Sequence, residues 1–197
     1  MKKFITFEGI DGSGKTTVIE AVKKQLEDQD FSVVCTQEPT DTWIGRCVQR
    51  CIRSKTDPVV TAFTFISDRI VHGKEIQRWL GKYDVILCDR YADSTYAYQG
   101  AQLEDSLDDP VHWLKELSKN RFPLPDVTFL FDIDPEIAIK RIQDRDDLID
   151  FEKVAFLEKV RRQYLNISEE SNMMIIDATK PVEEIVSTCV KTIMNHQ

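Results

Sequence analysis

A segment close to the N-terminus has the residues and spacing of a phosphate-binding loop. Positions 9–16 read Gly-Ile-Asp-Gly-Ser-Gly-Lys-Thr and match G-x-x-x-x-G-K-[ST] at every fixed position. The glycines allow the backbone to curl so that its N–H groups face a phosphate, and a following helix adds its positive N-terminal end. Lys15 can bridge the β- and γ-phosphates, while the Thr16 hydroxyl can bind Mg²⁺. The segment therefore predicts a site for a magnesium–nucleoside triphosphate.

A carboxylate and a guanidinium follow an apolar segment in the middle of the chain. Asp89 and Arg90 come directly after DVILC at 84–88, which has the pattern of a buried strand. If that strand lies beside the phosphate-binding loop, Asp89 can support the magnesium ion and Arg90 can neutralise a phosphate. A helix N-cap or a surface ion pair is the alternative role for Asp89.

Two further pairs of residues are each separated by one helical turn. Phe65 and Arg69 share one face of a predicted helix, where a ring could stack on a base and a guanidinium could bond to its edge. Arg141 and Arg145 are spaced in the same way and could neutralise a transferring phosphoryl group. Taken alone, Phe65 could equally belong to the core, and the two arginines could belong to a solvated helix face.

The elements that must position these residues alternate along the 197-residue chain. Short apolar runs alternate with segments of helical periodicity, which indicates a single α/β domain over 1–197 with a mostly parallel sheet. The predicted strands span 3–7, 31–37, 84–88, 127–131 and 173–176, and the predicted helices span 15–29, 43–53, 59–80, 135–141, 151–170 and 182–194. Ligands bind such sheets at the carboxyl ends of the strands, which is where the phosphate-binding loop and Asp89 fall.

The composition excludes several classes of protein. Asp and Glu number 34 against 26 Lys and Arg, so the net charge is −8 and a broad nucleic-acid or anionic-membrane surface is not expected. No apolar run approaches the ~18 residues of a membrane span, and the N-terminus lacks a long signal-type apolar stretch. A GTPase would carry an N-K-x-D-like motif that reads guanine, and the sequence has none. A small kinase fits the remaining possibilities.

The five cysteines, at positions 35, 47, 51, 88 and 189, have no spacing typical of a disulfide framework. Cys47 and Cys51 lie one helical turn apart, but no nearby histidine or second cysteine pair completes a metal site. Reduced, packed thiols in a cytoplasmic protein are therefore expected, with a metal or disulfide role as the alternative.

Seven motifs, in this order along nearly the whole chain, resemble those of the thymidylate kinase family. They are FEGIDGSGKTT at 7–17, EPTDTWIG at 38–45, FISDR at 65–69, DRYADSTYAYQG at 89–100, RIQDR at 141–145, VRRQY at 160–164 and IIDATKP at 175–181. A phosphate-binding loop is common, whereas its combination with F-x-x-x-R and D-R-Y…S-T-x-x-Y is much more specific. The resemblance implies a P-loop kinase fold, with a five-stranded parallel sheet of order 2-3-1-4-5 and a short lid at 141–152. It also implies transfer of the γ-phosphoryl group of MgATP to dTMP.

The resemblance implies roles for individual residues as well. Donor ATP would be bound by Gly9, Ile10, Asp11, Gly12, Ser13, Gly14, Lys15, Thr16, Thr17, Arg141, Ala178, Thr179 and Lys180. Acceptor dTMP would be bound by Asp11, Glu38, Pro39, Arg46, Phe65, Arg69, Arg90, Ser94, Thr95, Tyr98 and Tyr164. Thr16 and Asp89 would hold Mg²⁺ directly or through water. The catalytic residues would be Lys15, Arg90, Arg145 and Asp11.

Within the acceptor site, the resemblance gives several side chains a specific task. Phe65 would stack on thymine, Arg69 would donate to its O4, and Tyr98 would crowd the 2′ carbon. Arg90 would clamp the acceptor phosphate close to the γ-phosphate, and Tyr164 would close over the acceptor. Because the acceptor is already an anionic phosphate, the reaction needs no strong general base.

The sequence departs from the usual family pattern at two places. Some members carry a catalytic arginine at the position of Gly12, so its absence here points to the lid and to Arg145 or Arg141. That lid is unusually acidic between 144 and 152. In the second helix an arginine that many members use for the acceptor phosphate is also replaced, by Gln49, which leaves Arg46 or the nearby Arg50 as substitutes.

The resemblance further implies a homodimer, for which the apolar face of the helix at 59–80 is a candidate interface. Two other functions stay open on the sequence alone. The protein could be a kinase for another acceptor, such as dUMP or a deoxynucleoside, since Thr95 lies where the choice of base could be influenced. It could also be a nucleotide-binding regulator that has lost turnover. Four intact residues argue against this: Lys15, Asp89, Arg90 and Arg145.

Overall fold

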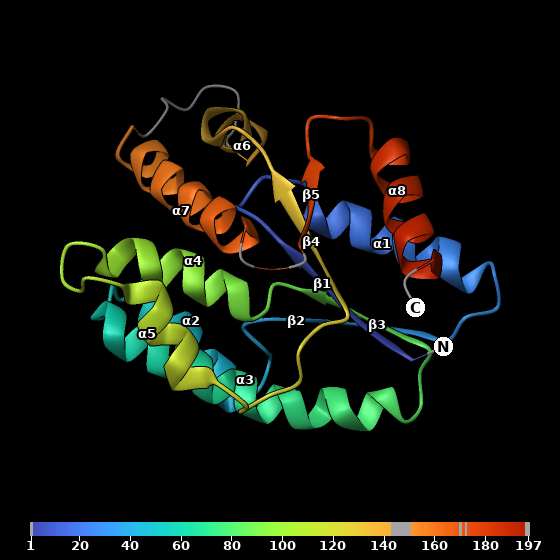
Figure 1. The fold of residues 1–197 in the computed structure, drawn as a ribbon, viewed down its shortest axis with the longest axis horizontal. Coiled ribbons are helices and arrows are strands. Elements are labelled where there is room, and N and C mark those ends of the chain that lie inside the picture. The colour runs from blue at the N-terminus through green and yellow to red at the C-terminus, as the bar shows by residue number, and fades with distance from the viewer. Residues whose placement is uncertain (1, 143–150, 170, 172, 196–197) are drawn as a thin grey trace.

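The structure, a computed structural model, describes residues 2–142, 151–169, 171 and 173–195. Its centre is a parallel sheet of five strands in the order β2-β3-β1-β4-β5 (Figure 1). The strands are β1 at Lys3–Glu8, β2 at Val33–Gln37, β3 at Val85–Asp89, β4 at Val127–Asp132 and β5 at Met173–Asp177. The strand order and the parallel direction predicted from the resemblance are therefore confirmed.

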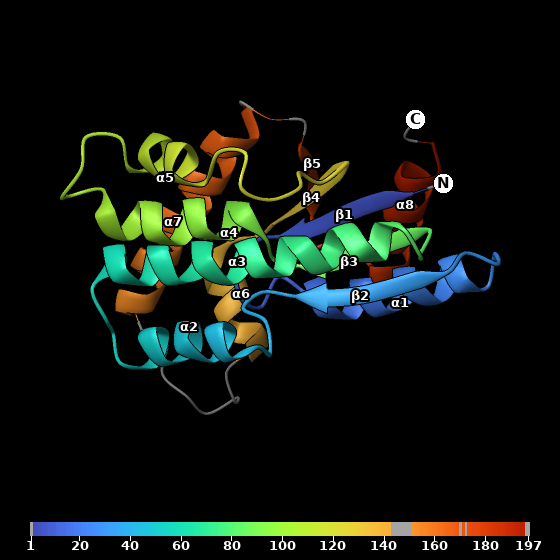
Figure 2. The ribbon, with the colours of Figure 1, turned by 90° about the horizontal axis from the view of Figure 1, so that it is seen from below.

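Helices cover both faces of this sheet. Those of the described residues are α1 at Lys15–Glu27, α2 at Trp43–Arg53, α3 at Pro58–Leu80, α4 at Ala92–Leu103, α5 at Pro110–Ser118, α6 at Pro135–Ile142, α7 at Phe151–Glu169 and α8 at Val182–Asn195. Figure 1 shows α1 and α8 on one side of the sheet and α3, α4 and α7 on the other. In Figure 2, α2 lies along α3 and α5 lies along α4. Within the described part of the chain, no helix is long and apolar enough to cross a membrane.

The local sequence explains how these elements begin and where they pack. The central strands β1 and β4 are buried almost throughout, as their nearly continuous apolar runs require. Asp57 caps α3 by accepting from the N–H of Val59 at 2.8 Å, and Pro58 occupies the first helical position. Thr42 caps α2 by accepting from the N–H of Gly45 at 3.2 Å. Such caps fix the ends of the helices that face the functional site.

Six helices were predicted close to their observed positions, but α4 and α5 were missed. α4 has the sequence ADSTYAYQGAQL, and its buried residues include Ser94, Thr95, Gln99 and Gly100 as well as apolar ones. A helix buried on most sides has no polar face, so the periodic signal that identified the other helices is absent. α5 spans only nine residues, which gives a short window for any periodic pattern.

The prediction of packed thiols is correct for two cysteines and wrong for two others. All five are free, and Cys88 and Cys189 are buried in the core. Cys35 and Cys47 are exposed instead, because they lie on the outer sides of β2 and α2. Among the described residues, no three His, Cys, Asp or Glu side chains gather where they could hold a metal ion.

Candidate active site

The phosphate-binding loop connects the end of β1 to the start of α1. Gly14 directly precedes α1 with a φ of +89°, a conformation that glycine adopts without strain. The loop borders a cavity of about 260 Å³, which is also lined by Thr17, Asp89 and Arg90. The structure thus brings the predicted loop, a predicted metal ligand and a predicted catalytic arginine around one cavity.

Lys15 is buried and folds back onto its own loop. Its Nζ donates to the carbonyl oxygens of Gly9 and Ile10 at 2.9 and 3.0 Å, and to the Ser13 hydroxyl at 3.3 Å. Burial, together with the nearby charge of Arg90, lowers the pKa of Lys15 to about 7, although neighbouring carboxylates act in the opposite direction. A phosphate in the cavity would offer further acceptor oxygens and would favour the charged form of Lys15.

The two predicted metal ligands contact each other. Thr16 Oγ1 donates to Asp89 Oδ2 at 2.8 Å, because the start of α1 and the end of β3 meet at the same edge of the sheet. The second carboxylate oxygen, Asp89 Oδ1, is buried and has no hydrogen-bond partner among the described residues. Mg²⁺ prefers oxygen ligands, and a hydroxyl beside a carboxylate with a free oxygen supplies them. These residues therefore fit the metal that the sequence predicts.

Arg90 lies between the phosphate-binding loop and α4. Its Nη1 donates to the carbonyl oxygen of Gly9 at 2.9 Å and to Ser94 Oγ at 3.2 Å, and its Nη2 pairs with Asp11 Oδ1 at 2.5 Å. The guanidinium lies 5.3 Å from the centre of the Tyr98 ring, within the range of a cation–π contact. Although burial raises it, nearby positive charges, with Arg90 foremost, bring the pKa of the Asp11 carboxyl below its usual value.

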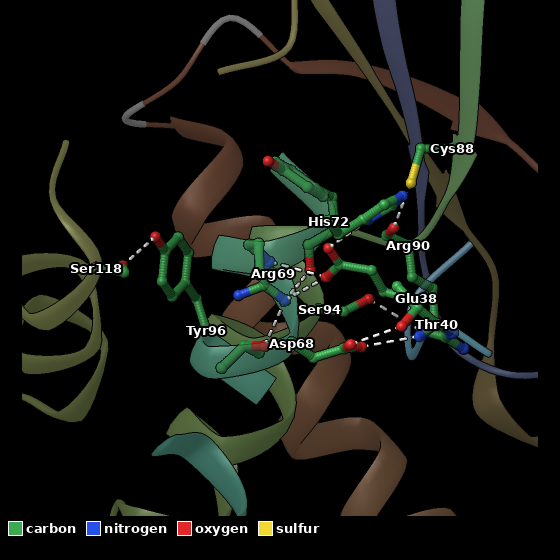
Figure 3. Close-up of polar contacts among 12 residues, drawn as sticks. Glu38, Thr40, Asp68, Arg69, His72, Cys88, Arg90, Ser94, Tyr96 and Ser118 are labelled. Carbon is green, nitrogen blue, oxygen red and sulfur yellow. Dashed lines mark hydrogen bonds and ion pairs between the residues drawn. The ribbon is translucent and has the colours of Figure 1, made fainter. Parts of the chain in front are cut away.

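Arg69 is fully buried at the centre of a second group of polar residues, here called the Arg69 cluster, which includes Glu38 and Thr95 (Figure 3). Its Nε donates to Glu38 Oε2 at 2.8 Å, and its Nη2 donates to the Tyr91 carbonyl at 2.9 Å and to Thr95 Oγ1 at 2.8 Å. The rings of Tyr91 and Phe122 lie 5.3 and 5.4 Å from the guanidinium carbon. The remaining nitrogen, Nη1, is buried without a hydrogen-bond partner among the described residues. The arginine is thus held rigidly and still has one donor to offer a ligand.

The loop after β2 is fixed to α3 by contacts that the sequence analysis missed. His72 Nδ1 bonds to Glu38 Oε1 at 2.9 Å (Figure 3). On the other side of the ring, His72 Nε2 bonds to Thr36 Oγ1 at 2.7 Å. Asp68 accepts from the Thr40 backbone N–H at 2.8 Å and from its hydroxyl at 2.6 Å. Asp68 and His72 flank Arg69 in α3, so three nearby residues hold the segment that contains Glu38. Pro39, in the same segment, is partly exposed.

A predicted residue and one that was missed each lie one helical turn from a member of the Arg69 cluster. Phe65 is partly exposed and lies one turn before Arg69 on α3, so its ring is available for stacking. Gln99 lies one turn after Thr95 on α4 and is buried, with Oε1 unpartnered among the described residues. Thr95 bonds to Arg69 and lies one turn before Gln99. The unpartnered Arg69 Nη1 and Gln99 Oε1 therefore belong to two side chains that are both next to Thr95. The signal for Gln99 was present in the motif DRYADSTYAYQG, but α4 itself had not been predicted.

Ser94 and Tyr164 meet at a buried carboxylate that the sequence analysis also missed. Glu8, the last residue of β1, accepts from Ser94 Oγ at 2.5 Å and from the Tyr164 hydroxyl at 3.1 Å. Tyr164 is almost fully buried, and its hydroxyl also contacts Ser94 Oγ at 2.8 Å. Tyr164 was expected to close over the acceptor, but its hydroxyl is directed into this internal cluster. In the sequence, Glu8 could have been noticed only as a single carboxylate at the end of a buried strand.

Arg141, predicted to bind ATP, contacts the segment 178–180, which was predicted to lie against the adenine of ATP. Arg141 Nη2 donates to the carbonyl oxygen of Ala178 at 3.0 Å, and Arg141 Nη1 is 4.0 Å from where a Cβ on Gly14 would be. Arg141 therefore lies close to the phosphate-binding loop, as predicted. Thr179 and Lys180 are exposed next to Ala178, where Thr179 bonds to the preceding strand end and Lys180 pairs with α8.

The remaining predicted arginines lie at the surface or outside the described residues. Arg46 is exposed on α2, and its Nη1 donates to the Asp41 carbonyl at 2.8 Å. Arg50, its alternative, is exposed one turn later. Arg145, the predicted catalytic arginine of the lid, lies outside the described residues, as does most of the acidic stretch that surrounds it.

Comparisons with known proteins agree with this arrangement. Residues 7–189 match the model of the family described as Thymidylate kinase. The chain is 40% identical over 196 residues to a probable thymidylate kinase of Methanosarcina mazei, covering 98% of this chain and 95% of that protein. It is 42% identical to the protein of the same name from Methanosarcina barkeri, covering 98% and 96%. A protein of Saccharolobus solfataricus named probable thymidylate kinase 1 is 36% identical, covering 100% and 99%. The chain belongs to the thymidylate kinase family.

Proposed function

We propose that this protein transfers the γ-phosphoryl group of MgATP to dTMP, giving dTDP and ADP. Membership of the family supports this function, and so does the position of Arg90 between the two sites. The observation that carries the proposal is a pair of buried polar groups without a hydrogen-bond partner among the described residues, the Arg69 Nη1 donor and the Gln99 Oε1 acceptor.

This pair complements one edge of thymine. Thymine offers an acceptor at O4 and a donor at N3–H, so Arg69 and Gln99 could each satisfy one of them. Cytosine offers a donor and an acceptor at the same positions, so both contacts would become unfavourable. A buried donor or acceptor without a hydrogen-bond partner costs free energy. A base that bonds to both Arg69 and Gln99 is therefore favoured over a base that bonds to neither. Phe65, one turn from Arg69, would stack on the ring.

The phosphate groups would meet at the phosphate-binding loop. Lys15 would contact the β- and γ-phosphates of ATP, and Arg90 would hold the acceptor phosphate beside them. Both cations are fixed by the protein before substrates arrive, so little reorganisation is needed when charge shifts during transfer. Asp11 would release one side of Arg90 and accept from the 3′-hydroxyl of dTMP. Arg145 would add a further positive charge to the transferring group.

Thr16 and Asp89 would hold Mg²⁺, directly or through water. When bound, the ion would neutralise charge on the β- and γ-phosphates. Asp89 Oδ1 supports this assignment because a buried carboxylate oxygen without a donor suits a cation.

Other residues would define the periphery of the two substrate sites. Tyr98 lies against Arg90 and would crowd the 2′ carbon, which disfavours a ribose. Glu38 and Pro39 would shape the monophosphate pocket, and Arg46 would approach the acceptor phosphate. For the donor, the segment 178–180 would flank the adenine, and Arg141 would also contact ATP.

We propose further that the protein is a homodimer of the cytoplasm. Two adjacent helices, α2 and α3, expose several large apolar side chains, among them Trp43 at 69%, Ile52 at 52%, Val60 at 50% and Phe63 at 48%. Apolar side chains of this size are what a subunit interface buries. Five free cysteines are in keeping with a reducing compartment.

A panel of acceptors tests the proposed reaction. ADP release is measured with MgATP and each of dTMP, dUMP, dCMP, the ribonucleotide of thymine and thymidine. We expect dTMP to have the highest kcat/KM, with dCMP lower by about 100-fold or more because both edge contacts are lost. A better acceptor than dTMP would contradict the substrate. Tight ATP binding without transfer to any acceptor would instead support a non-catalytic regulator.

A further inference from the structure

Glu8 is a buried carboxylate to which the proposed reaction gives no role. It is fully shielded from solvent at the end of β1. Three donors converge on it from the start of α4 and from α7: the Tyr91 backbone N–H on Oε1 at 2.8 Å, and Ser94 Oγ and the Tyr164 hydroxyl on Oε2 at 2.5 and 3.1 Å. Burial raises the pKa of Glu8 above its usual value, while these hydrogen bonds lower it. Because an unpaired buried carboxylate is costly, the donors must stay where it can reach them.

The first of these contacts fixes a strained turn. Arg90 has a φ of +67°, in the left-handed region that residues other than glycine rarely occupy. Its N–H donates to the carbonyl oxygen of Phe7 at 2.9 Å, and the following N–H, of Tyr91, donates to Glu8. Phe7 and Glu8 are consecutive in β1, so the end of that strand holds both peptides of the turn. Strain of this kind persists only where the surrounding structure imposes it, and it is common at functional sites.

The second contact fixes the side chain of the same arginine. Ser94 Oγ accepts from Arg90 Nη1 at 3.2 Å and donates to Glu8 Oε2 at 2.5 Å. Glu8 therefore acts on Arg90 in two ways. It holds the backbone that follows Arg90 through the Tyr91 N–H, and it holds the Arg90 guanidinium through the Ser94 hydroxyl. The guanidinium is left facing the cavity of the phosphate-binding loop.

We propose that Glu8 is a positioning residue for Arg90. Its two carboxylate oxygens hold the turn after β3 and the Ser94 hydroxyl, so that the Arg90 guanidinium points to the phosphates before substrates bind. This inference rests on the proposed function only in that Arg90 binds the acceptor phosphate. The geometry requires acceptor oxygens at Glu8, so an amide can replace the carboxylate in part and a thioether cannot.

Kinetics of two variants test this requirement. Glu8→Met keeps the length of the side chain but removes its acceptors, and we expect it to lower kcat/KM for the acceptor by about 100-fold. Glu8→Gln keeps one oxygen for the Tyr91 N–H, and we expect a loss below about tenfold. In both variants the KM for ATP should change by less than about threefold, because the three donors that bond to Glu8 all lie outside the phosphate-binding loop. Equal activity of the two variants would overturn the proposal.

Thr6→Val is the matched control for a general effect on stability. Thr6 is buried two residues earlier on the same face of β1, and its hydroxyl bonds to Thr128 at 2.8 Å, away from Arg90. This variant should lower the melting temperature but leave kcat/KM within about twofold. A loss of activity in Thr6→Val as large as that in Glu8→Met would mean that Glu8 acts through stability alone, which overturns its positioning role.

A double-mutant cycle asks whether Glu8 acts through Arg90. On an Arg90→Lys background, Glu8→Met should lower kcat/KM by less than about threefold, because the group that it positions has already changed. The same loss on both backgrounds would overturn the proposal. The cycle is measured with whichever acceptor the wild type uses best, so a failure of the dTMP assignment does not affect it.

A crystal structure of Glu8→Met without substrates tests the conformation of Arg90 directly. We expect Arg90 to leave the left-handed region and to lose its hydrogen bond to the Gly9 carbonyl. If Arg90 keeps both, the proposal is overturned, whatever the acceptor is. Should Glu8→Met not fold, Ser94→Ala takes its place, because it removes only the hydroxyl between Glu8 and Arg90. A loss in kcat/KM of about tenfold, absent on the Arg90→Lys background, is then expected, and an unchanged kcat/KM overturns the proposal.

Discussion

A Cβ atom built on Gly12 would lie 2.2 Å from the carbonyl oxygen of Ala138, so α6 packs directly against the backbone of the phosphate-binding loop. Gly12 also has a φ of +83°, which strains any residue with a side chain. An arginine at this position, which some family members carry, therefore has no room unless α6 moves. This contact supports the expectation that the catalytic arginine of this protein comes from another segment.

This packing predicts a difference between two glycines of the same loop. We expect Gly12→Ala to lower the free energy of unfolding by about 2 kcal/mol or more, because backbone strain and overpacking add. Gly14 has a similar φ of +89°, but the nearest atom to its Cβ is Arg141 Nη1 at 4.0 Å. Gly14→Ala should therefore cost only the strain, about 1 kcal/mol. Urea unfolding measures both, and equal losses would contradict the packing argument.

The contact between Thr16 and Asp89 predicts how the reaction depends on magnesium. Asp89→Asn removes the negative charge beside the Thr16 hydroxyl, so we expect a higher Mg²⁺ concentration for half-maximal rate and a kcat lower by about 100-fold. Thr16→Ser keeps the hydroxyl and should stay within about tenfold of the wild type. Initial rates over a range of Mg²⁺ concentrations at saturating ATP provide the measurement. An Asp89→Asn variant with the wild-type Mg²⁺ dependence would exclude Asp89 from the metal site.

The lowered pKa of Lys15 predicts proton uptake when ATP binds. Because this pKa is about 7 in the free protein, Lys15 is mostly neutral at higher pH. A bound triphosphate stabilises the charged form, so at about pH 8.5 we expect binding to take up roughly one proton, and at about pH 6 much less. Calorimetry in two buffers of different ionisation enthalpy counts the protons. Lys15→Met should abolish the uptake at the higher pH, and its persistence would assign the proton to another group.

Much of the fold was predictable because most of its helices and strands have a sequence pattern that is typical of their secondary structure. The strands β1, β3 and β4 are apolar runs whose burial in the sheet leaves little choice of conformation. The missed helix α4 packs against α3, α5 and α7, so it lacks the polar face that reveals a helix at the protein surface. The order of the strands came from the family resemblance, since periodicity alone does not fix it.

The candidate site was predictable where one short segment carries the chemistry. The phosphate-binding loop, Asp89 and Arg90 all follow strands directly, and the structure brings them together. Glu8 was missed because its meaning depends on distant partners: its hydrogen bond to Tyr164 spans 156 positions. His72 was missed for the same reason, since its partners Glu38 and Thr36 lie 34 and 36 positions away, whereas Gln99 was missed because α4 was not predicted. Single-sequence patterns report neighbours along the chain, whereas these residues are defined by neighbours in space.

The unpartnered Gln99 acceptor predicts a test of base recognition. Gln99→Leu keeps the size of the side chain but removes the acceptor that would meet N3–H of thymine. We expect the KM for dTMP to rise by about tenfold and the preference for dTMP over dCMP to fall, because one of the two edge contacts is gone. The KM for ATP should not change. Gln25, which is exposed on α1 on the other side of the sheet, offers the control Gln25→Leu. Equal effects of the two substitutions would refute the role of Gln99.

The exposed apolar side chains of α2 and α3 predict how subunits associate. Phe63 is 48% exposed on α3, and Phe63→Glu would place a charge on the proposed interface, so we expect the dimer dissociation constant to rise by at least about tenfold. Val182, 40% exposed on α8 across the sheet, provides the control: Val182→Glu puts a favourable acidic residue at a helix N-terminus and should leave the dimer intact. Sedimentation velocity over a range of concentrations distinguishes the two variants. A wild type that stays monomeric would refute the dimer, whereas a dimer unaffected by Phe63→Glu would move the interface to another face.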